Sequence, residues 1–482
     1  MGKFTVSFVA AMMFAFSFSP GSLAFGLPQE TAPHHGAEAQ EQKQEEGTEQ
    51  LGKTRKQKPQ EHPHEHRMTG IQDQMQGMHY GGKSMHAESL VQKIVDHDTS
   101  GTSIEPNSTP MAMLMTMKGN WMLMFHGVGF LNATQQSGPR GFDKIFSTNW
   151  VMPMAQRPLG PGTFTVRTML TLEPATVTKR RYPELFQLGE TAFGKPTVDQ
   201  QHPHDFLMEL AVLYDLKLGE NGLLSFYAAP VGDPAMGPTA FPHRISASEN
   251  PLAPLGHHLQ DSTHIANDVV TLGVTYKFLR LEASGFHGRE PDDRRWDIDS
   301  GKMDSWSTRL TINPFQNWSV QYSVARLNSP EELNPKEDTL RMTASVMYNR
   351  PLRNGNWASM LLWGRNRSLP SDEVFNSYLA ESTLRFRTRN YVWGRVENVD
   401  RTNQLLLGEN PLPPGFEERF LGRVQAYTVG YDRDFDLIPH WATAIGGQVT
   451  FYSVPTSLNS IYGSHPLGVV LFVRVRPFQE SR

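Results

Sequence analysis

The 482-residue chain contains no cysteine. This excludes disulfide bonds, thiolate metal ligands and a cysteine nucleophile. The formal net charge is -4 at pH 7, and this lack of a basic excess argues against a nucleic-acid partner. After the first 24 residues the chain also lacks a run of about 18 apolar residues, so we expect no transmembrane helix.

The first 24 residues have the features of a secretory signal peptide. Lys3 supplies a basic start, residues 8–16 are continuously apolar, and Ser22-Leu23-Ala24 offers the small residues that signal peptidase reads. We expect cleavage after Ala24 and exclude residues 1–24 from the fold. An exported chain without disulfides fits a bacterial envelope protein, either soluble or a β-barrel.

Residues 25–118 are rich in Gln, Glu, His, Lys and Met and poor in aromatic residues. Such a composition cannot bury enough apolar surface to offset the entropy of the chain. We therefore predict a disordered periplasmic leader with one short amphipathic helix over residues 87–95, where Leu90, Ile94 and Val95 lie near one face.

The leader also carries residues that bind metals. Thioethers select Cu(I) and imidazoles take Cu(II), and metal binding is a standard interpretation of a His-rich tract. The alternative is a polar tail in which these residues have no role. The candidate ligands are His62, His64, His66, Met78, His79, Met85 and His86.

From about residue 119 the chain shows the two-residue period of β-strands. For example, apolar Val270, Leu272, Val274, Tyr276 and Phe278 alternate with Thr271, Gly273, Thr275 and Lys277. We predict an all-β fold for residues 119–482, an antiparallel transmembrane β-barrel of about 16 strands. A soluble periplasmic sandwich or propeller is the alternative, although no repeat of blade length supports a propeller.

The links between strands alternate in length, as they do in outer-membrane barrels with short periplasmic turns and long external loops. Short links are expected at 158–162, 218–222, 278–279, 313–317, 351–356 and 387–390. Long links are expected at 131–146, 174–203, 232–267, 288–303, 327–338, 367–377, 401–419 and 454–466.

Two further residue sets fit a barrel. Aromatic residues near strand ends are expected at the membrane interfaces, namely Trp121, Trp150, Trp306, Trp318, Trp357 and Trp441. Charged residues on the polar strand faces are expected in the lumen, where an excess of arginine would favour anions. These are Arg309, Arg341, Glu381, Arg385, Arg474 and Arg476.

Three successive long loops carry imidazoles and carboxylates that can bind a borderline metal. Their spacing matches no named zinc motif, and the alternative is that they hydrogen-bond to one another and hold the loops. The candidate metal ligands are His202, His204, Asp205, His243, His257, His258, Asp261, His264 and His287.

Blocks of these loops resemble a family of uncharacterised bacterial outer-membrane proteins. The blocks are QHPHDFLMELAVLYD, VGDPAMGPTAFPHRISASENPLAPLGHHLQDSTHI and SGFHGREPDDRRWDIDSGKMDSW, and the resemblance covers most of residues 119–478. It implies a barrel and assigns no activity. In composition only, the leader is similar to that of the copper-resistance B family of outer-membrane proteins.

Three functions follow from these observations. The leading hypothesis is binding or transport in metal handling, with copper as the favoured ion and zinc as the alternative. The second is a passive porin-like channel for small solutes or anions. The third is an outer-membrane hydrolase using Ser262 near His264, although the chain has no nucleophile motif, so we expect no enzyme. The expected partners are membrane lipid, metal ions or small solutes, and a periplasmic protein reached through the leader.

Overall fold

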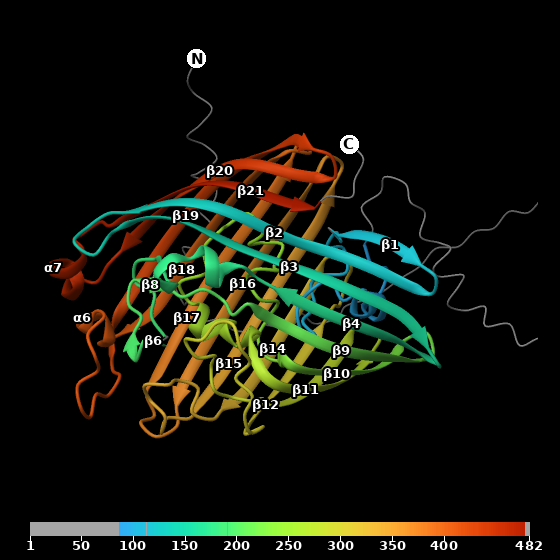
Figure 1. The fold of residues 1–482 in the computed structure, drawn as a ribbon, viewed down its shortest axis with the longest axis horizontal. Coiled ribbons are helices and arrows are strands. Elements are labelled where there is room, and N and C mark those ends of the chain that lie inside the picture. Colours follow the sequence, from blue (N-terminus) through green and yellow to red (C-terminus); the bar gives the residue numbers. More distant parts are fainter. Residues whose placement is uncertain (1–85, 112, 190, 478–482) are drawn as a thin grey trace, which may run out of the picture. The chain divides into compact units, whose positions relative to one another are not determined.

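The computed structural model describes residues 86–111, 113–189 and 191–477. In this part of the chain sixteen antiparallel strands form one closed sheet, because the first of them pairs with the last (Figure 1). The predicted barrel and its strand number are confirmed. The strands of the wall are β2 (Trp121–Gln136), β3 (Asp143–Leu159), β4 (Gly162–Leu170), β9 (Leu207–Leu218), β10 (Gly222–Gly232), β11 (Ala266–Tyr276), β12 (Leu279–His287), β13 (Ser305–Ile312), β14 (Trp318–Leu327), β15 (Thr339–Leu352), β16 (Gly355–Ser368), β17 (Val374–Phe386), β18 (Asn390–Thr402), β19 (Phe420–Ile438), β20 (Trp441–Ser453) and β21 (Leu467–Pro477).

The remaining elements are short and lie between or before the wall strands. They are α3 (Leu90–Asp96), β1 (Leu114–Lys118), α4 (Glu173–Thr176), η2 (Thr178–Arg180), β5 (Tyr182–Pro183), β6 (Thr191–Ala192), β7 (Lys195–Pro196), β8 (Gln200–Gln201), α5 (His257–Gln260), η3 (Ser262–His264), α6 (Gln404–Leu407), η4 (Thr456–Leu458) and α7 (Asn459–Tyr462). No helix among the described residues is both long and apolar enough to cross a membrane.

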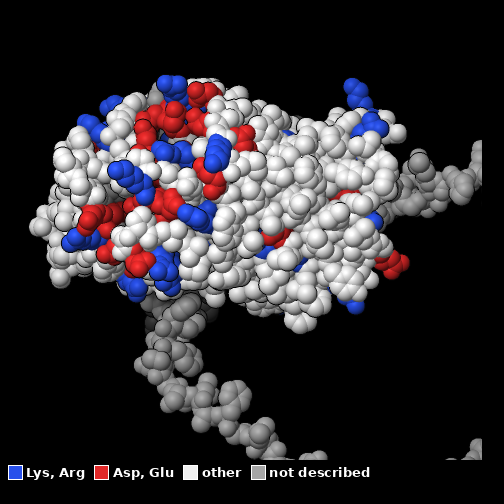
Figure 2. Space-filling view, turned by 90° about the horizontal axis from the view of Figure 1, so that it is seen from below, with Lys and Arg blue, Asp and Glu red and all other residues white. Residues whose placement is uncertain are grey.

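The two faces of the wall have the opposite polarity to those of a soluble protein. On β11, Leu272 is 57% exposed and Val274 is 55% exposed, whereas Thr271 is 1% exposed. The apolar face therefore points outward and the polar face is covered from within, as lipid on one side and a polar lumen on the other require. Figure 2 shows a wide band of the wall with few charged residues, while Lys, Arg, Asp and Glu gather at the end where the long loops of Figure 1 lie.

The alternation of link lengths is confirmed, with two differences. The long link predicted at 367–377 spans only residues 369–373, because β16 and β17 extend beyond the predicted ends. The first long link spans only residues 137–142, because β2 and β3 extend beyond the predicted ends. Four of the predicted interfacial tryptophans are exposed on the outer face, namely Trp306, Trp318, Trp357 and Trp441. Trp150 was assigned to the interface wrongly, since its ring packs inside against His126 and His243.

The N-terminal part of the described chain lies inside the barrel. Residues 86–111, here called the inner segment, contain α3, which begins after the cap Ser89 and buries Leu90 and Ile94 against Leu223 of β10. The helix expected over residues 87–95 is thus confirmed in position. The predicted disorder of residues 25–118 is wrong for residues 86–111 and for β1, whereas residues 25–85 and the signal peptide lie outside the described residues.

The lumen holds the inner segment because the wall supplies hydrogen-bond partners to its backbone. Arg167 of β4 donates to the carbonyls of Thr99 and Gly101, and Asn349 of β15 donates to the carbonyl of Ser108. Composition alone predicted disorder because it counts apolar burial, and this segment is instead ordered by polar contacts.

The inner segment leaves the lumen through β1, which completes the barrel seam. The first half of β2 pairs with β1, so that Trp121 lies opposite Lys118 and Phe125 lies opposite Leu114. The second half of β2 pairs with β21, from Gly129 to Gln136. Two strands therefore share one edge of β2, and the chain joins the inner segment directly to the wall.

Candidate functional site

Two long loops fold into the lumen and pack against its charged lining. Arg244, in the loop of residues 233–265 between β10 and β11, pairs with Glu381 of β17 at 2.5 Å. In the same loop, Glu249 pairs with Arg474 and Arg476 of β21. The loop of residues 171–206 between β4 and β9 contributes Glu173 and the buried Glu184. The lumen is therefore narrowed by these two loops and by the inner segment.

Five of the predicted loop histidines come together as one buried group, here called the histidine cluster: His202, His204, His257, His258 and His264. Ring centroids lie 5.1 Å apart for His204–His264 and for His257–His258, 5.2 Å for His257–His264, 6.1 Å for His202–His258 and 6.4 Å for His202–His204. The rings thus close a circle, and Phe241 packs against three of them.

Most rings of the cluster are held through the same nitrogen. Nδ1 of His204 lies 2.8 Å from Glu173 Oε2, and Nδ1 of His257 lies 2.7 Å from Asp261 Oδ1. Nδ1 of His264 lies 2.8 Å from the carbonyl of Asp261. These oxygens accept, so Nδ1 donates in each case, and in a neutral ring the lone pair then lies on Nε2. Metal-binding histidines in proteins are usually oriented in this way.

Burial sets the protonation of this group. It lowers the pKa of His202, His258 and His264 well below the usual value, and the neighbouring imidazoles lower the pKa further. Burial alone would raise the pKa of Asp261, but His257 and Arg244 beside it hold that pKa below its usual range. Burial therefore favours the neutral form of His202, His258 and His264, and neutral imidazole is the form that binds metal.

The other predicted loop ligands lie elsewhere. Asp205 pairs with Arg295 at 3.0 Å, and His243 packs on Trp150. His287 lies at the end of β12, where its Nδ1 is 2.9 Å from the carbonyl of Lys302. Ser262, the residue of the hydrolase hypothesis, bonds to Arg341 rather than to an imidazole.

Of the predicted leader ligands, His86 is exposed at the start of the described chain. The others, His62, His64, His66, Met78, His79 and Met85, lie outside the described residues.

The predicted lumen charges are inside, but most are neutralised. Arg309 pairs with Glu282 at 3.0 Å, Glu381 pairs with Arg244 and Arg395, and Arg474 pairs with Asp432 and Asp434 as well as Glu249. Arg341 bonds to Asn366 and Ser262. Arg385 lies near a turn and donates to the carbonyl of Thr388. The excess of positive charge that would favour anions is thus not seen at these residues.

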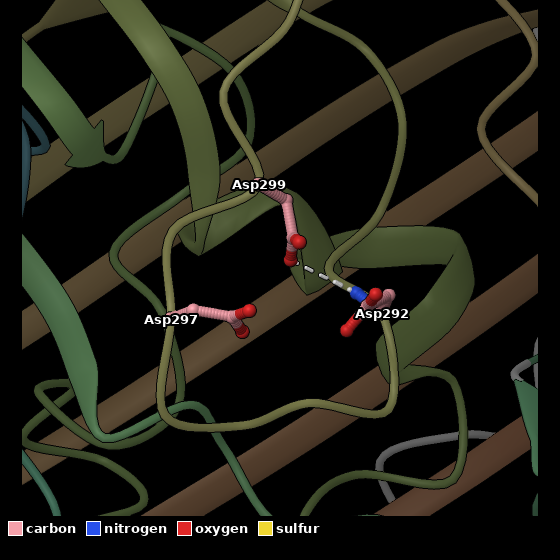
Figure 3. A group of neighbouring side chains, drawn as sticks. All are labelled: Asp292, Asp297 and Asp299. Atoms are coloured by element: carbon pink, nitrogen blue, oxygen red, sulfur yellow. Dashed lines mark hydrogen bonds between the residues drawn. The ribbon is translucent and has the colours of Figure 1, made fainter.

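A second group of candidate ligands lies in the loop after β12. Asp292, Asp297 and Asp299 have oxygens within 4.8 Å of one another, and the backbone of Asp292 donates to Asp299 (Figure 3). Among the described His, Asp and Glu residues this trio reaches that spacing, and the histidine cluster does not. The three side chains are exposed or half-exposed, however, and nothing else at this place points to an ion.

No family model matches the chain, and no curated protein matches it. The resemblance of the three sequence blocks to an uncharacterised family therefore stays a prediction. Solved structures with similar folds include an anion-selective porin from Comamonas acidovorans, with 11% identity, 74% of this chain and 99% of that chain covered, and a TM-score of 0.46. A Salmonella typhi OmpF complex with daunomycin shows 9% identity, 75% and 100% coverage, and a TM-score of 0.44. OmpT of Vibrio cholerae shows 6% identity, 75% and 100% coverage, and a TM-score of 0.41.

One set of lumen residues was not predicted from the sequence. His126 of β2 faces inward beside Trp150, and several methionines on β2, β3, β4 and β9 are buried with it. A signal was present in the stretches MLMFH and VMPM, where methionines alternate with other residues at the period of a strand. Because methionine counts as apolar, the alternation did not show which face it occupied.

Proposed function

We propose that this protein is an outer-membrane barrel that passes small solutes through a lumen narrowed by the inner segment and two loops. The outer apolar face and polar inner face of the closed wall carry the proposal, since this polarity suits a chain with lipid outside and water-compatible groups inside. Because most of the arginines of the lumen pair with carboxylates, we propose only weak selection by charge.

The inner segment is the main restriction in this proposal, and Arg167 is its chief anchor. This buried side chain donates to the carbonyls of His97, Thr99 and Gly101 and pairs with Glu209 at 2.7 Å. Replacing both partners with neutral residues removes the anchor and leaves no unpaired charge in the lumen.

Planar-bilayer recording of the full mature chain tests the channel. We expect small single-channel currents, and larger currents for the double variant Arg167→Met/Glu209→Gln, in which the inner segment is released. The control is Arg326→Met/Asp338→Asn, a solvent-accessible ion pair between the end of β14 and the loop that follows it, and this variant should conduct like the wild type. Currents no greater than those of bare lipid for all three proteins would rule the channel out.

A second candidate function is metal handling through the histidine cluster. The observation that favours it is the shared use of Nδ1 as the anchored nitrogen in His204, His257 and His264. Binding three imidazoles to one ion would need side-chain rotation, because their ligand nitrogens do not all lie within 4.8 Å.

A further inference from the structure

One side of the lumen is lined by a run of methionines, whereas many inward positions elsewhere on the wall are polar. The buried cluster contains Met122 and Met124 of β2, Met152 and Met154 of β3, Met169 of β4 and Met208 of β9, which we call the methionine panel. Elsewhere the inward positions are residues such as Thr271, Ser307 and Arg309. The inner faces of four neighbouring wall strands therefore carry methionine at positions that are often polar on the other strands.

The panel is continuous across strand pairs. Met124 lies opposite Met154, and His126 lies opposite Met152, in the register of β2 and β3. Met113, which precedes β1, belongs to the same cluster, and Met111 and Met115 pack against it. Ile265, which follows His264 of the histidine cluster, packs in the same buried cluster as the panel. Thioethers thus extend from the start of β1 across β2, β3, β4 and β9.

Two histidines, His126 and His243, lie against the panel. His243 Nε2 is 3.2 Å from Met169 Sδ. His126 is 7% exposed, and its Nε2 has no hydrogen-bond partner. The ring centroids of His126 and His243 are 5.7 Å apart, and those of Trp150 and His243 are 4.3 Å apart.

Packing alone explains only part of this arrangement. Methionine adapts to irregular space, so a panel could simply fill the gap between the wall and its contents. Filling a gap does not require a buried imidazole with an unpartnered nitrogen, because leaving such a group unsatisfied costs free energy. Leucine or phenylalanine at position 126 would fill the space without that cost.

We propose that Met169, His243 and His126 form a binding site for a soft monovalent cation, Cu(I) or Ag(I). Thioether sulfur selects soft ions, and imidazole completes the coordination of copper. The remaining methionines of the panel provide weaker positions along which the ion reaches this site. Binding of the ion at these three residues does not require that the barrel conducts solutes.

Silver and cuprous ion retention by the full mature chain in detergent tests the site. The variant Met169→Leu/His243→Phe removes sulfur and imidazole but keeps the apolar volume and an aromatic ring on Trp150. The matched control is Met347→Leu/Met360→Leu, a buried cross-strand methionine pair in a cluster that contains no histidine. The leader is the same in all three proteins, so its own metal binding cancels in the comparison.

We expect the wild type and the control to retain one more Ag(I) per chain than the double variant. Competition with a chromophoric Cu(I) chelator should show affinity lower by at least about ten-fold for Met169→Leu alone, which serves if the double variant does not fold. Zn(II) binding should be unchanged by Met169→Leu, since zinc gains little from a thioether. Equal Ag(I) retention in wild type and variant, or an equal loss in the control, would overturn the proposal.

Discussion

At the scale of single residues, the histidine cluster is organised by its acceptors. Asp261 holds two rings, through its carboxylate to His257 and through its carbonyl to His264, and Arg244 pairs with the same carboxylate at 2.9 Å. Each ring is therefore fixed in orientation by groups of its own loop. Imidazoles fixed in this way suit either a metal site or the packing of two loops, and mutation distinguishes the two roles by what it changes.

Replacing His257 and His264 together with glutamine separates these roles. If the cluster binds metal, the variant should bind Zn(II) or Cu(II) at least about ten-fold more weakly, because two ligands are lost. The measurement is titration calorimetry on the detergent-solubilised full chain. His287→Gln is the control, since this histidine lies apart at the end of β12.

A structural role predicts a different pattern. The double variant would then lose thermal stability, followed by the shift of the folded band on unheated gels, while metal binding in the two proteins would be the same. Unchanged metal affinity in His257→Gln/His264→Gln would therefore remove metal handling at this cluster.

The sequence predicted the histidine cluster in part. Its five members come from long links that an outer-membrane barrel places at one end, so their meeting followed from topology. The second pair, His126 and His243, joins a strand to a loop, and nothing in their spacing shows that contact. Their methionine neighbours were hidden because an inward and an outward methionine look alike in a hydrophobic pattern.

At the scale of secondary structure elements, the wall strands could be predicted from the sequence because their two faces differ strongly in polarity. The same alternation placed four tryptophans correctly and failed for Trp150, which lies on the inward face beside His126. The inner segment was missed for a related reason: its backbone finds partners in a polar lumen that appears only once the wall has closed.

Strand β11 offers a test of the outward face. Arginine at Leu272, in the middle of the strand, should lower the free energy of unfolding by about 2–4 kcal/mol, because a charge there faces the lipid core. The substitution Tyr276→Arg, beside the short turn, should lower the free energy of unfolding by only about 0–1 kcal/mol, because the arginine side chain reaches the membrane interface.

Urea unfolding in lipid vesicles measures both variants, and Leu272→Ala serves as the control for lost apolar contact. Equal costs for the two arginine variants would contradict the membrane position assigned to β11.

At the scale of the whole molecule, the hold of the lumen on the inner segment depends on pH. Burial raises the pKa of Glu105 from 4.5 to about 7, although Lys93 and Arg244 act in the opposite direction, and Asp98 adds to the rise. Burial therefore favours the protonated form of the Glu105 carboxyl. The protonated carboxyl stabilises the inner segment in the lumen, and this stabilisation is complete below pH 4.5 and is lost as the pH rises through about 7.

We expect the inner segment to become more accessible to protease between pH 4.5 and 7, with little further change above that range. Asp96, whose pKa burial also raises to about 7, should act in the same sense. Glu105→Gln should flatten the dependence because the amide does not titrate, and Glu88→Gln, an exposed position of the same segment, should leave it intact. Cleavage that increases as the pH falls would contradict this assignment.

The shared edge of β2 has a kinetic consequence. Because the chain passes directly from the inner segment into β1, and β1 is paired to the wall, a released segment cannot diffuse away. Its return is an intramolecular event, governed by an effective concentration that is in the millimolar range for short flexible tethers. Openings of the barrel should therefore be brief, with closing times that do not depend on how much protein the membrane contains.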